Sequence, residues 1–553
     1  MNTLFKYGFL LLLGLSVTTS ASSQRMEQYI EAADTAFVRQ DYYSASQFYS
    51  DALLYDQDSS RVDLRYRLGE SYLKFTAYQR ALDVFVEVRA LQDSLEYPLL
   101  PLLEAEAYQR LGEYDQAIER YELFLAEEQG TALQRQDAER QLINSEWAAD
   151  VVSRPKDISF FHLPGDVNSA DSDFAPFFQD DELYFSSLRF KMEDDKQRPK
   201  RKIAKIMLRE GLAEDAEFEE LPVRINQKGR IVSHSAFDEA GTTVYYTICD
   251  YLEESVDFRC DLYCSSVNSK GEWGEPKRLP VNAEGANNTE PNVAKLPDGK
   301  EYLLFVSDRE GGQGGLDIYQ SEILGPAECG PVTPLTSVNT EEDDLTPFYY
   351  APTQVLYFST NGRLTLGGYD VYRAAWNGVG YDRPTHLGIP VNSSYDDLYY
   401  SRFPDQEQAY FASNRPDTAA IFWDENQDVC CYDIYRIGIG DEIRLLATTW
   451  HALDLTELDG TTVTLYEKLP NGERREIKRL TNPTENDFNF TVIPGKVYEL
   501  EATKPGFTLA REEVDLTDPE LADEKEIERK LYLSPDIELD VFTFNKEDGT
   551  DLA

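Results

Sequence analysis

Residues 281–319, with the sequence VNAEGANNTEPNVAKLPDGKEYLLFVSDREGGQGGLDIY, contain one complete copy of a unit that recurs along the middle of the chain. The unit opens with a Val-Asn or Ile-Asn step, continues with an aromatic-rich strand and ends with an Asp-x-Tyr strand. The five steps are Val167-Asn168, Ile225-Asn226, Val281-Asn282, Val338-Asn339 and Val391-Asn392, and their asparagines are 58, 56, 57 and 53 residues apart. A period near 56 with several short strands predicts the blades of a β-propeller, because solenoid repeats are usually shorter.

The sequence also indicates how such a ring closes. The fifth Asp-x-Tyr strand, Asp433-Ile434-Tyr435, is followed by a segment of different character, so its blade lacks an outer strand. A candidate strand over 157–163 precedes the first Val-Asn step. Pairing it with the fifth blade would leave no open sheet edge, and we therefore expect five blades closed by both ends of the domain.

The repeat carries further motifs beyond the strands. The third copy contains Thr289-Glu290-Pro291, Pro297-Asp298-Gly299-Lys300, Ser307-Asp308-Arg309 and Gly314-Gly315-Leu316-Asp317-Ile318-Tyr319. These residues resemble the WD40-like propeller repeat known as PD40, which occurs in periplasmic TolB-type proteins and in large OmpA-family proteins. The resemblance implies a propeller over 155–440.

A second, shorter period precedes the propeller. Ala45, Ala81 and Ala117 are spaced by 36 residues, and an aromatic follows each of them four residues later as Tyr49, Phe85 and Tyr121. Small and large residues at this spacing fit antiparallel helix pairs that approach closely. The pattern resembles the tetratricopeptide (TPR) repeat, which implies a helical domain over 25–150 with a concave groove for a protein partner.

The chain ends suggest export and additional modules. Lys6, the apolar run from Phe9 to Val17 and Thr19-Ser20-Ala21 predict a signal peptide over 1–21, and therefore an exported protein. Alternating strands over 445–535 resemble a carboxypeptidase-regulatory-like or Cna-B-type β-sandwich. Residues 536–553 begin either a further module or a tail.

The order of these parts resembles OmpA-family, PorE-like envelope proteins of the Bacteroidetes type, which are associated with type IX secretion and gliding. The expected fold class is multidomain, α then β, with a TPR helical repeat, a five-bladed β-propeller and a small β-sandwich. The resemblance implies a non-enzymatic periplasmic scaffold whose partners are envelope or outer-membrane proteins, bound by the TPR groove or the propeller. Peptidoglycan binding is implied by family order alone, since the OmpA-like domain that holds it does not occur in this sequence.

The sequence predicts no catalytic, cofactor or metal site. The four histidines, His162, His234, His386 and His451, have no metal-ligand spacing. Nucleic acid is not an expected partner, because 101 acidic residues against 53 basic ones give a formal charge of −48. The alternative function is a propeller that binds or cleaves glycans. Cleavage needs carboxylates that converge on the channel, and no acidic residue is seen to break the repeat.

Three smaller features remain open. Cys249 ends one predicted strand and Cys260 begins the next, which predicts a disulfide, while the adjacent Cys430 and Cys431 either bond to each other or pair elsewhere. Metal binding by Cys260 and Cys264 lacks a second ligand pair.

The loop over 423–428 is a solvated insertion or a calcium site. A basic segment is either a solvated loop or a docking site for an acidic partner, and it comprises Lys196, Arg198, Lys200, Arg201 and Lys202.

Overall fold

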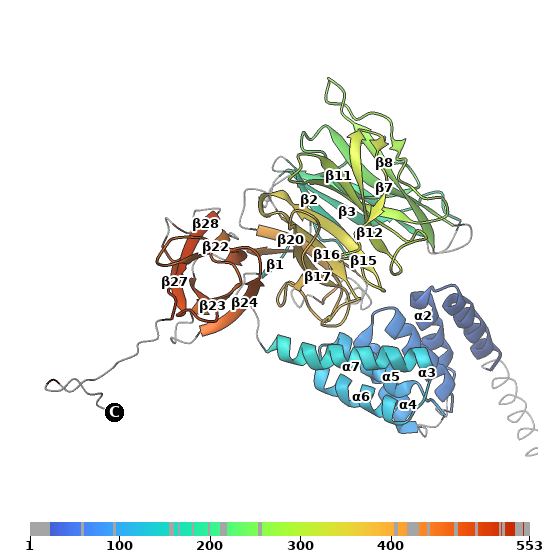
Figure 1. The fold of residues 1–553 in the computed structure, drawn as a ribbon. Helices are drawn as coiled ribbons and strands as arrows, with labels where there is room; N and C mark the ends of the chain where they lie inside the picture. The colour runs from blue at the N-terminus through green and yellow to red at the C-terminus, as the bar shows by residue number, and fades with distance from the viewer. Residues whose placement is uncertain are drawn as a thin grey trace, which may run out of the picture. The chain divides into compact units, whose positions relative to one another are not determined.

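The computed structural model describes residues 23–536 and 546, apart from 57–59, 92–95, 154–159, 164–165, 180–181, 197–199, 211–217, 253–256, 403–407, 417–430, 439–442, 469–473, 493–495, 519–520 and 522–525. The chain divides into two compact units, Met1–Gly438 and Ile439–Ala553. Helices begin the first unit, and strands form the rest of the described chain (Figure 1).

The first unit opens with antiparallel helix pairs. A helix over 23–38 precedes α2 (Tyr42–Leu53), α3 (Val62–Lys74), α4 (Tyr78–Leu91), α5 (Leu100–Arg110), α6 (Tyr114–Ala126) and α7 (Ala132–Val152). The alanine and aromatic columns seen in the sequence are buried in this segment, in three successive clusters. Close approach is required here, because a Cβ at Gly69 would lie 2.4 Å from the Phe85 ring.

The prediction of an α-then-β chain defined by a TPR repeat is wrong. The described chain is mainly β, and a TPR repeat is not shown for its helices. The physical reason is that small residues opposite large ones are needed wherever two helices pack closely. The spacing of Ala45, Ala81 and Ala117 therefore indicates helix pairs without identifying the repeat family.

Five sheets follow, and each runs outward from one inner strand. The first is β2 (Asp173–Gln179), β3 (Glu182–Lys191), β4 (Lys202–Glu210) and β5 (Phe218–Glu220). The second is β6 (Ile231–Phe237), β7 (Thr243–Tyr251), β8 (Phe258–Ser266) and β9 (Lys277–Arg278). The third is β10 (Asn288–Lys295), β11 (Glu301–Ser307), β12 (Asp317–Gly325), β13 (Glu328–Cys329) and β14 (Thr333–Pro334). The fourth is β15 (Asp344–Tyr350), β16 (Val355–Thr360), β17 (Asp370–Ala375) and β18 (Thr385–His386), with η1 (Ala351–Thr353) between β15 and β16.

The fifth sheet joins two distant parts of the chain. It has the order β1 (Phe160–His162), β21 (Asp433–Gly438), β20 (Gln408–Ser413) and β19 (Asp397–Arg402), with His162 opposite Tyr435. The inner strands β2, β6, β10, β15 and β19 contact one another in a closed cycle. The sheets therefore form the ring of a five-bladed propeller, and β1 pairs as the outer strand of the last blade (Figure 1).

The repeated asparagines hold each blade together. Asn226 accepts the backbone N–H of Ile206 through Oδ1 and donates through Nδ2 to the carbonyls of Ile206 and Leu221. Asn168 does the same in the closing blade, with Ile434 and Leu163. A buried amide that satisfies backbone groups on two strands is a structural requirement of every copy.

The Ser-x-Arg motif is also structural. Arg309 donates through Nε to Ser307 Oγ and through Nη2 to the carbonyl of Val281, at 3.1 and 2.8 Å. Arg189 and Arg415 repeat these contacts in other blades. The motif thus ties the second strand of a blade to its own Val-Asn step.

The second unit is a sandwich of two sheets. One contains β25 (Asp487–Val492), β22 (Ile443–His451) and β28 (Glu526–Leu533), and the other contains β24 (Arg474–Asn482), β23 (Thr461–Lys468), β26 (Val497–Thr503) and β27 (Ala510–Asp515). Their inner faces share one apolar core that includes Leu445, Val463, Phe490 and Leu500.

Candidate functional site

A β-bulge interrupts the inner strand of every blade at the same point. One residue of each bulge is left-handed, with φ between 52° and 58°. These residues are Ala175, His234, Glu290, Thr346 and Tyr399. A left-handed conformation is uncommon for residues other than glycine, and its fivefold repetition turns the five side chains toward one pocket.

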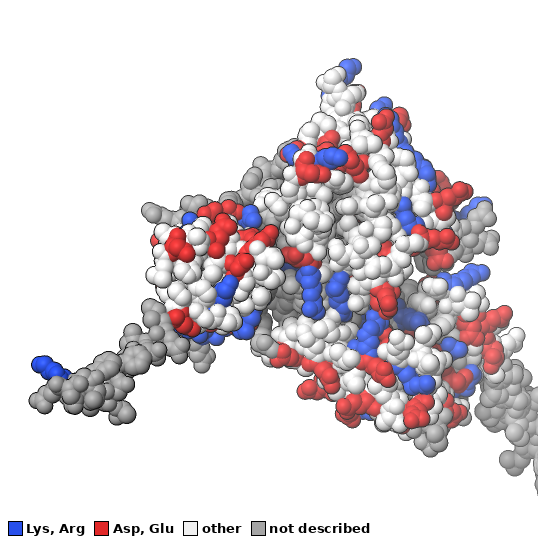
Figure 2. All heavy atoms as spheres, in the orientation of Figure 1, with Lys and Arg blue, Asp and Glu red and all other residues white. Residues whose placement is uncertain are grey.

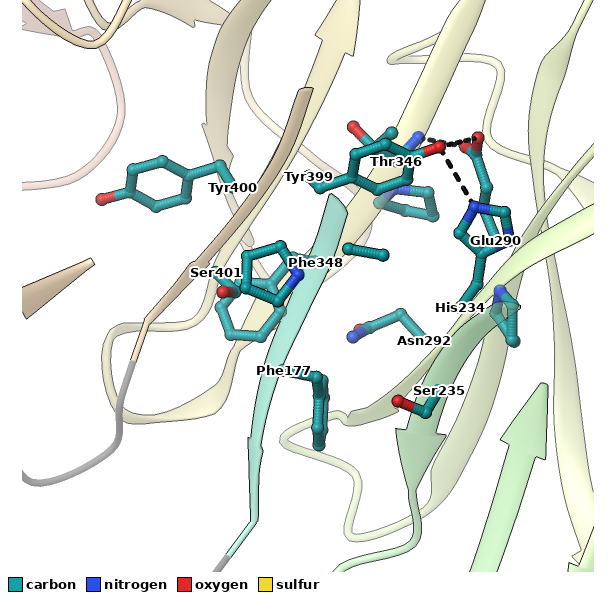
Figure 3. A pocket seen from close by; sticks show the side chains of 14 residues that line it. Phe177, His234, Ser235, Glu290, Asn292, Thr346, Phe348, Tyr399, Tyr400 and Ser401 are labelled. Carbon is teal, nitrogen blue, oxygen red and sulfur yellow. Dashed lines mark hydrogen bonds between the residues drawn. The ribbon is translucent and has the colours of Figure 1, made fainter. Parts of the chain in front are cut away.

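The pocket lies among the inner strands and is lined by all five blades (Figure 3). Its cavity volume is about 50 Å³. Glu290, His234, Thr346 and Tyr399 form its polar part, while Phe177 and Phe348 supply aromatic walls. Aromatic walls with a few convergent polar groups are typical of small-molecule sites.

Glu290 is held by two donors from two other blades. The Thr346 N–H donates to its Oε2 at 2.7 Å, and the Tyr399 hydroxyl donates to its Oε1 at 3.2 Å. In blades two and three the N–H of the bulge residue instead meets a hydroxyl of the preceding blade, as in His234 to Ser186 Oγ. In the blade that precedes Thr346, the equivalent position holds Val306, which has no hydroxyl. The Thr346 N–H is therefore accepted by the Glu290 carboxylate.

His234 and Tyr399 meet across the first blade. Their rings stack at 5.4 Å, and His234 Nε2 lies 3.1 Å from the Tyr399 hydroxyl. The first blade stands between theirs in the ring, and its bulge residue is the small Ala175. Phe174 of the same blade packs against both rings. Because Tyr399 donates its proton to Glu290, we assign the proton of His234 to Nε2, which then donates to the Tyr399 oxygen.

The other ring nitrogen fits that tautomer. His234 Nδ1 lies 3.0 Å from the Ser233 hydroxyl and 3.3 Å from the hydroxyls of Thr247 and Thr289. Each of these hydroxyls can donate to an unprotonated nitrogen. A continuous hydrogen-bonded path therefore runs from these hydroxyls through His234 and Tyr399 to Glu290.

Burial perturbs both ionisable ends of the path. It raises the pKa of Glu290 to about 7, although the hydrogen bonds from Thr346 and Tyr399 act in the opposite direction. Burial lowers the pKa of His234 to about 3, so the imidazole is neutral at physiological pH. A carboxyl that titrates near neutrality in a pocket is suited to donate and accept a proton within one reaction.

The two cysteines that were expected to form a disulfide lie on blade two. A disulfide joins Cys249 on β7 to Cys260 on β8, which are direct neighbours across the two strands. Cys264 and Cys329 are free thiols. Cys431 is disulfide-bonded, whereas Cys430 and the loop over 423–428 lie outside the described residues.

The basic segment is largely engaged within the chain. Arg201 pairs with Asp195 at 2.9 Å and lies over the Tyr251 ring, while Lys200 donates to the Glu193 carbonyl. Lys202 pairs with Asp171. Lys196 is exposed, and Arg198 lies outside the described residues. The structure therefore does not gather these cations into one site, and Figure 2 shows acidic and basic side chains intermixed over the visible face.

The described residues contain neither a metal-binding cluster nor a helix suited to cross a membrane. Within them, no cluster of three or more His, Cys, Asp and Glu residues is arranged to hold a metal ion. Among those same residues, none of the helices combines the length and apolar character that a membrane crossing requires.

The sequence reasoning missed Glu290 and His234. Glu290 belongs to the Thr289-Glu290-Pro291 motif of the repeat, and it is the one acidic residue among the five bulge positions, so the prediction that no acidic residue breaks the repeat is wrong. Each bulge residue follows the asparagine of its blade by seven or eight positions. When the five copies are aligned, this position holds Ala, His, Glu, Thr and Tyr in turn. A position whose residue type differs in every copy of an otherwise regular repeat is the sequence signal that points to the site.

The comparisons with known proteins give structural neighbours only. No family model and no curated protein matches the sequence. Among solved structures, an α-L-arabinofuranosidase from Lactobacillus brevis is 12% identical, with a TM-score of 0.34 over 49% of this chain and 92% of its own. A thermostable family-43 glycoside hydrolase is 11% identical, with a TM-score of 0.33 over 58% of this chain and 98% of its own. The RS223 β-xylosidase is 13% identical, with the same TM-score and the same coverage.

These findings correct the family and function predicted from the sequence. The OmpA-family, PorE-like identity and the link to type IX secretion are wrong, because no family model matches and the neighbours are glycoside hydrolases. The prediction of a non-enzymatic scaffold is contradicted as well, since the structural neighbours found are glycoside hydrolases. The sequence misled because the Val-Asn, Ser-x-Arg and Asp-x-Tyr motifs stabilise blades and carry no information about the ligand. At such low identities and TM-scores, the function rests on the site itself.

Proposed function

We propose that the propeller pocket binds the end of a saccharide and cleaves a glycosidic bond, with Glu290 as the residue that donates the proton. The observation that carries this proposal is the half-buried Glu290 carboxyl, whose pKa is raised to about 7 within a pocket lined by all five blades. An ordinary glutamate is fully ionised at neutral pH and cannot act as an acid.

The surroundings of Glu290 suit this role. Thr346 and Tyr399 fix the carboxyl from two sides, so that it does not need to be oriented when a substrate arrives. The neutral His234 supports the Tyr399 hydroxyl at 3.1 Å. The aromatic walls of Phe177 and Phe348 offer apolar surface against which the carbon face of a sugar ring can pack.

A second candidate function is saccharide binding without cleavage. Glycoside hydrolases generally use two carboxyl groups, and Glu290 is the one carboxyl among the described residues that line this pocket. This observation favours binding alone if no second acidic group enters the site with the substrate.

One experiment separates the candidates. The full chain and the Glu290→Gln variant are incubated with aryl pentosides, aryl hexosides and plant polysaccharides, and released product is measured; Glu284→Gln, at an exposed loop position, is the control. We expect cleavage by the wild type and the control, and a loss of roughly 100-fold or more in Glu290→Gln. Binding without turnover, measured by calorimetry, would support the second candidate. Absence of both would contradict the proposal.

Export is a separate proposal. The disulfide between Cys249 and Cys260 supports an oxidising compartment, and the signal peptide expected over 1–21 lies outside the described residues. Partners among envelope proteins stay a prediction, to be tested by recovery from envelope extracts.

A further inference from the structure

Two buried hydroxyls in the pocket have no hydrogen-bond partner. Ser235 is 5% exposed and Ser401 is 3% exposed, and both line the cavity. Among the described residues, no donor or acceptor meets either Oγ. Buried hydroxyls are nearly always paired, because leaving one unpaired costs free energy, so these two groups point to a partner from outside the chain.

A third polar group completes this set. Asn292 lies on β10, two residues after Glu290, and its Oδ1 accepts the Tyr349 N–H at 3.1 Å. This bond orients the amide, and within the described chain no acceptor is found for Nδ2. Ser235, Asn292 and Ser401 come from three different blades and surround the same space as Glu290 (Figure 3).

The pocket around these groups is free of cations. None of its described lining residues is a lysine or arginine, His234 is neutral, and Glu290 supplies the one carboxyl. A carboxylate brought here from a uronic or sialic acid would lose its hydration without gaining a counter-charge, and it would face Glu290. Two hydroxyls and an amide instead match neutral hydroxyl groups, which both donate and accept.

From these contacts we infer that the pocket is a subsite for the hydroxyl-bearing edge of a neutral saccharide, held by Ser235, Asn292 and Ser401, and that it rejects acidic sugars. The inference rests on the proposed function and narrows its substrate class. The cavity of about 50 Å³ has room for a few water-sized groups, so it takes the edge of a terminal sugar while the rest of the ring remains above it.

The test measures, for each serine variant, both the melting temperature and the affinity for sugars. Ser235→Ala and Ser401→Ala each remove a buried hydroxyl that has no partner, so we expect unchanged or higher melting temperatures. The same variants should bind neutral sugars at least fivefold more weakly. Ser321→Ala is the matched control, because the buried Ser321 Oγ donates to the Gly330 carbonyl at 2.8 Å in blade three. We expect it to lower the melting temperature and leave binding unchanged.

The probes are xylose, arabinose, glucose and galactose, compared with glucuronate, galacturonate and N-acetylneuraminate by saturation-transfer NMR on the full chain. We expect the neutral sugars to bind at least tenfold more tightly. Equal or tighter binding of the acidic sugars would overturn the inference, while turnover lost in Glu290→Gln would leave the proposed function standing. A lower melting temperature in both serine variants would also overturn it, because the hydroxyls would then be structural. Absence of binding and of cleavage for every saccharide would overturn both proposals together.

Discussion

The Tyr399 hydroxyl donates to the Glu290 carboxylate across 3.2 Å, although 109 residues separate the two in the chain. The two residues occupy the same bulge position in the fifth and third blades. The ring of five inner strands is what brings them together, since neither strand lies in the sheet of the other. This contact, together with the neutral His234 that supports the Tyr399 hydroxyl, makes the half-buried Glu290 carboxyl different from the structural aspartates of the blades.

Glu290 should make the stability of the first unit depend on pH. Its pKa rises from an ordinary value of 4.5 to about 7 in the folded state, so the folded protein binds this proton more tightly than the unfolded chain. The stabilisation is complete below about pH 4.5 and is lost as the pH rises through about 7. Glu290→Gln has no such proton. Thermal unfolding between pH 5 and pH 8 should show the variant gaining stability relative to wild type as the pH increases; a constant difference would contradict the assignment.

Tyr399→Phe should raise the pKa of Glu290 further. The Tyr399 hydroxyl donates to the carboxylate and so favours its ionised form, which opposes the effect of burial. Removing the hydroxyl removes that support, and the alkaline limb of the activity profile should move to higher pH. A carbon NMR titration of glutamate-labelled protein measures the same shift without turnover. Tyr410→Phe is the control, since the Tyr410 hydroxyl bonds Gln408 away from the pocket. An unchanged Glu290 titration would show that the contact has no electrostatic effect.

Arg110→Met should destabilise the contact between the helices and the fifth blade. Arg110 on α5 donates to Asp396 Oδ1 at 2.8 Å, and their side chains are 21% and 12% exposed. Burial raises the pKa of Asp396, but the charge and hydrogen bond of Arg110 outweigh burial and hold that pKa below its usual value. Losing the cation leaves a buried carboxylate uncompensated, at a cost of about 2–3 kcal/mol.

The control for this change is Lys300→Met. Lys300 and Glu322 pair at 3.0 Å on an exposed surface of blade three, where solvent screens their attraction, so Lys300→Met should lower the free energy of unfolding much less than Arg110→Met. Denaturant unfolding of both variants decides the comparison. Equal losses would show that the Arg110 pair is as solvent-screened as the surface pair.

Asn168→Ala should weaken the closure of the propeller. Asn168 accepts the Ile434 N–H and donates to the carbonyls of Leu163 and Ile434, which joins the two ends of the domain. Removing the amide leaves a buried backbone N–H unpaired, so we expect a loss of about 2 kcal/mol. Asn377→Ala, in an exposed turn of blade four, should change the free energy of unfolding by less than about 0.5 kcal/mol. Similar losses in both variants would contradict a special role for the closing blade.

The disulfide of blade two should contribute measurable stability. Cys249 and Cys260 close a loop whose ends are 11 residues apart, and restraining the unfolded chain by such a loop stabilises the folded state by roughly 2–3 kcal/mol. The double variant Cys249→Ser, Cys260→Ser avoids a lone thiol and should unfold at lower denaturant concentration. Reduced wild type should lose at least as much stability, because reduction also breaks the disulfide of Cys431. Non-reducing peptide mapping that found both thiols free would remove the basis of this prediction.

The sequence by itself determined where the blades lie. The Val-Asn steps, the Ser-x-Arg arginines and the Asp-x-Tyr strands recur because every blade needs the same hydrogen bonds, such as those of Asn226 and Arg309. Local requirements of this kind are visible in one chain, since each copy supplies its own donors and acceptors. The same is true of the cysteines, because Cys249 and Cys260 lie on two strands that follow one another in the chain and pair directly.

Only the tertiary structure decided which residues form the site. Glu290, His234 and Tyr399 stand at the same repeat position, but their contacts cross blade boundaries and depend on ring closure and on the left-handed bulge. The raised pKa of Glu290 likewise comes from burial among strands far apart in the sequence. A periodic sequence predicts the interactions that repeat within each unit, whereas chemistry that arises where unlike copies meet appears only after the copies have closed into a ring.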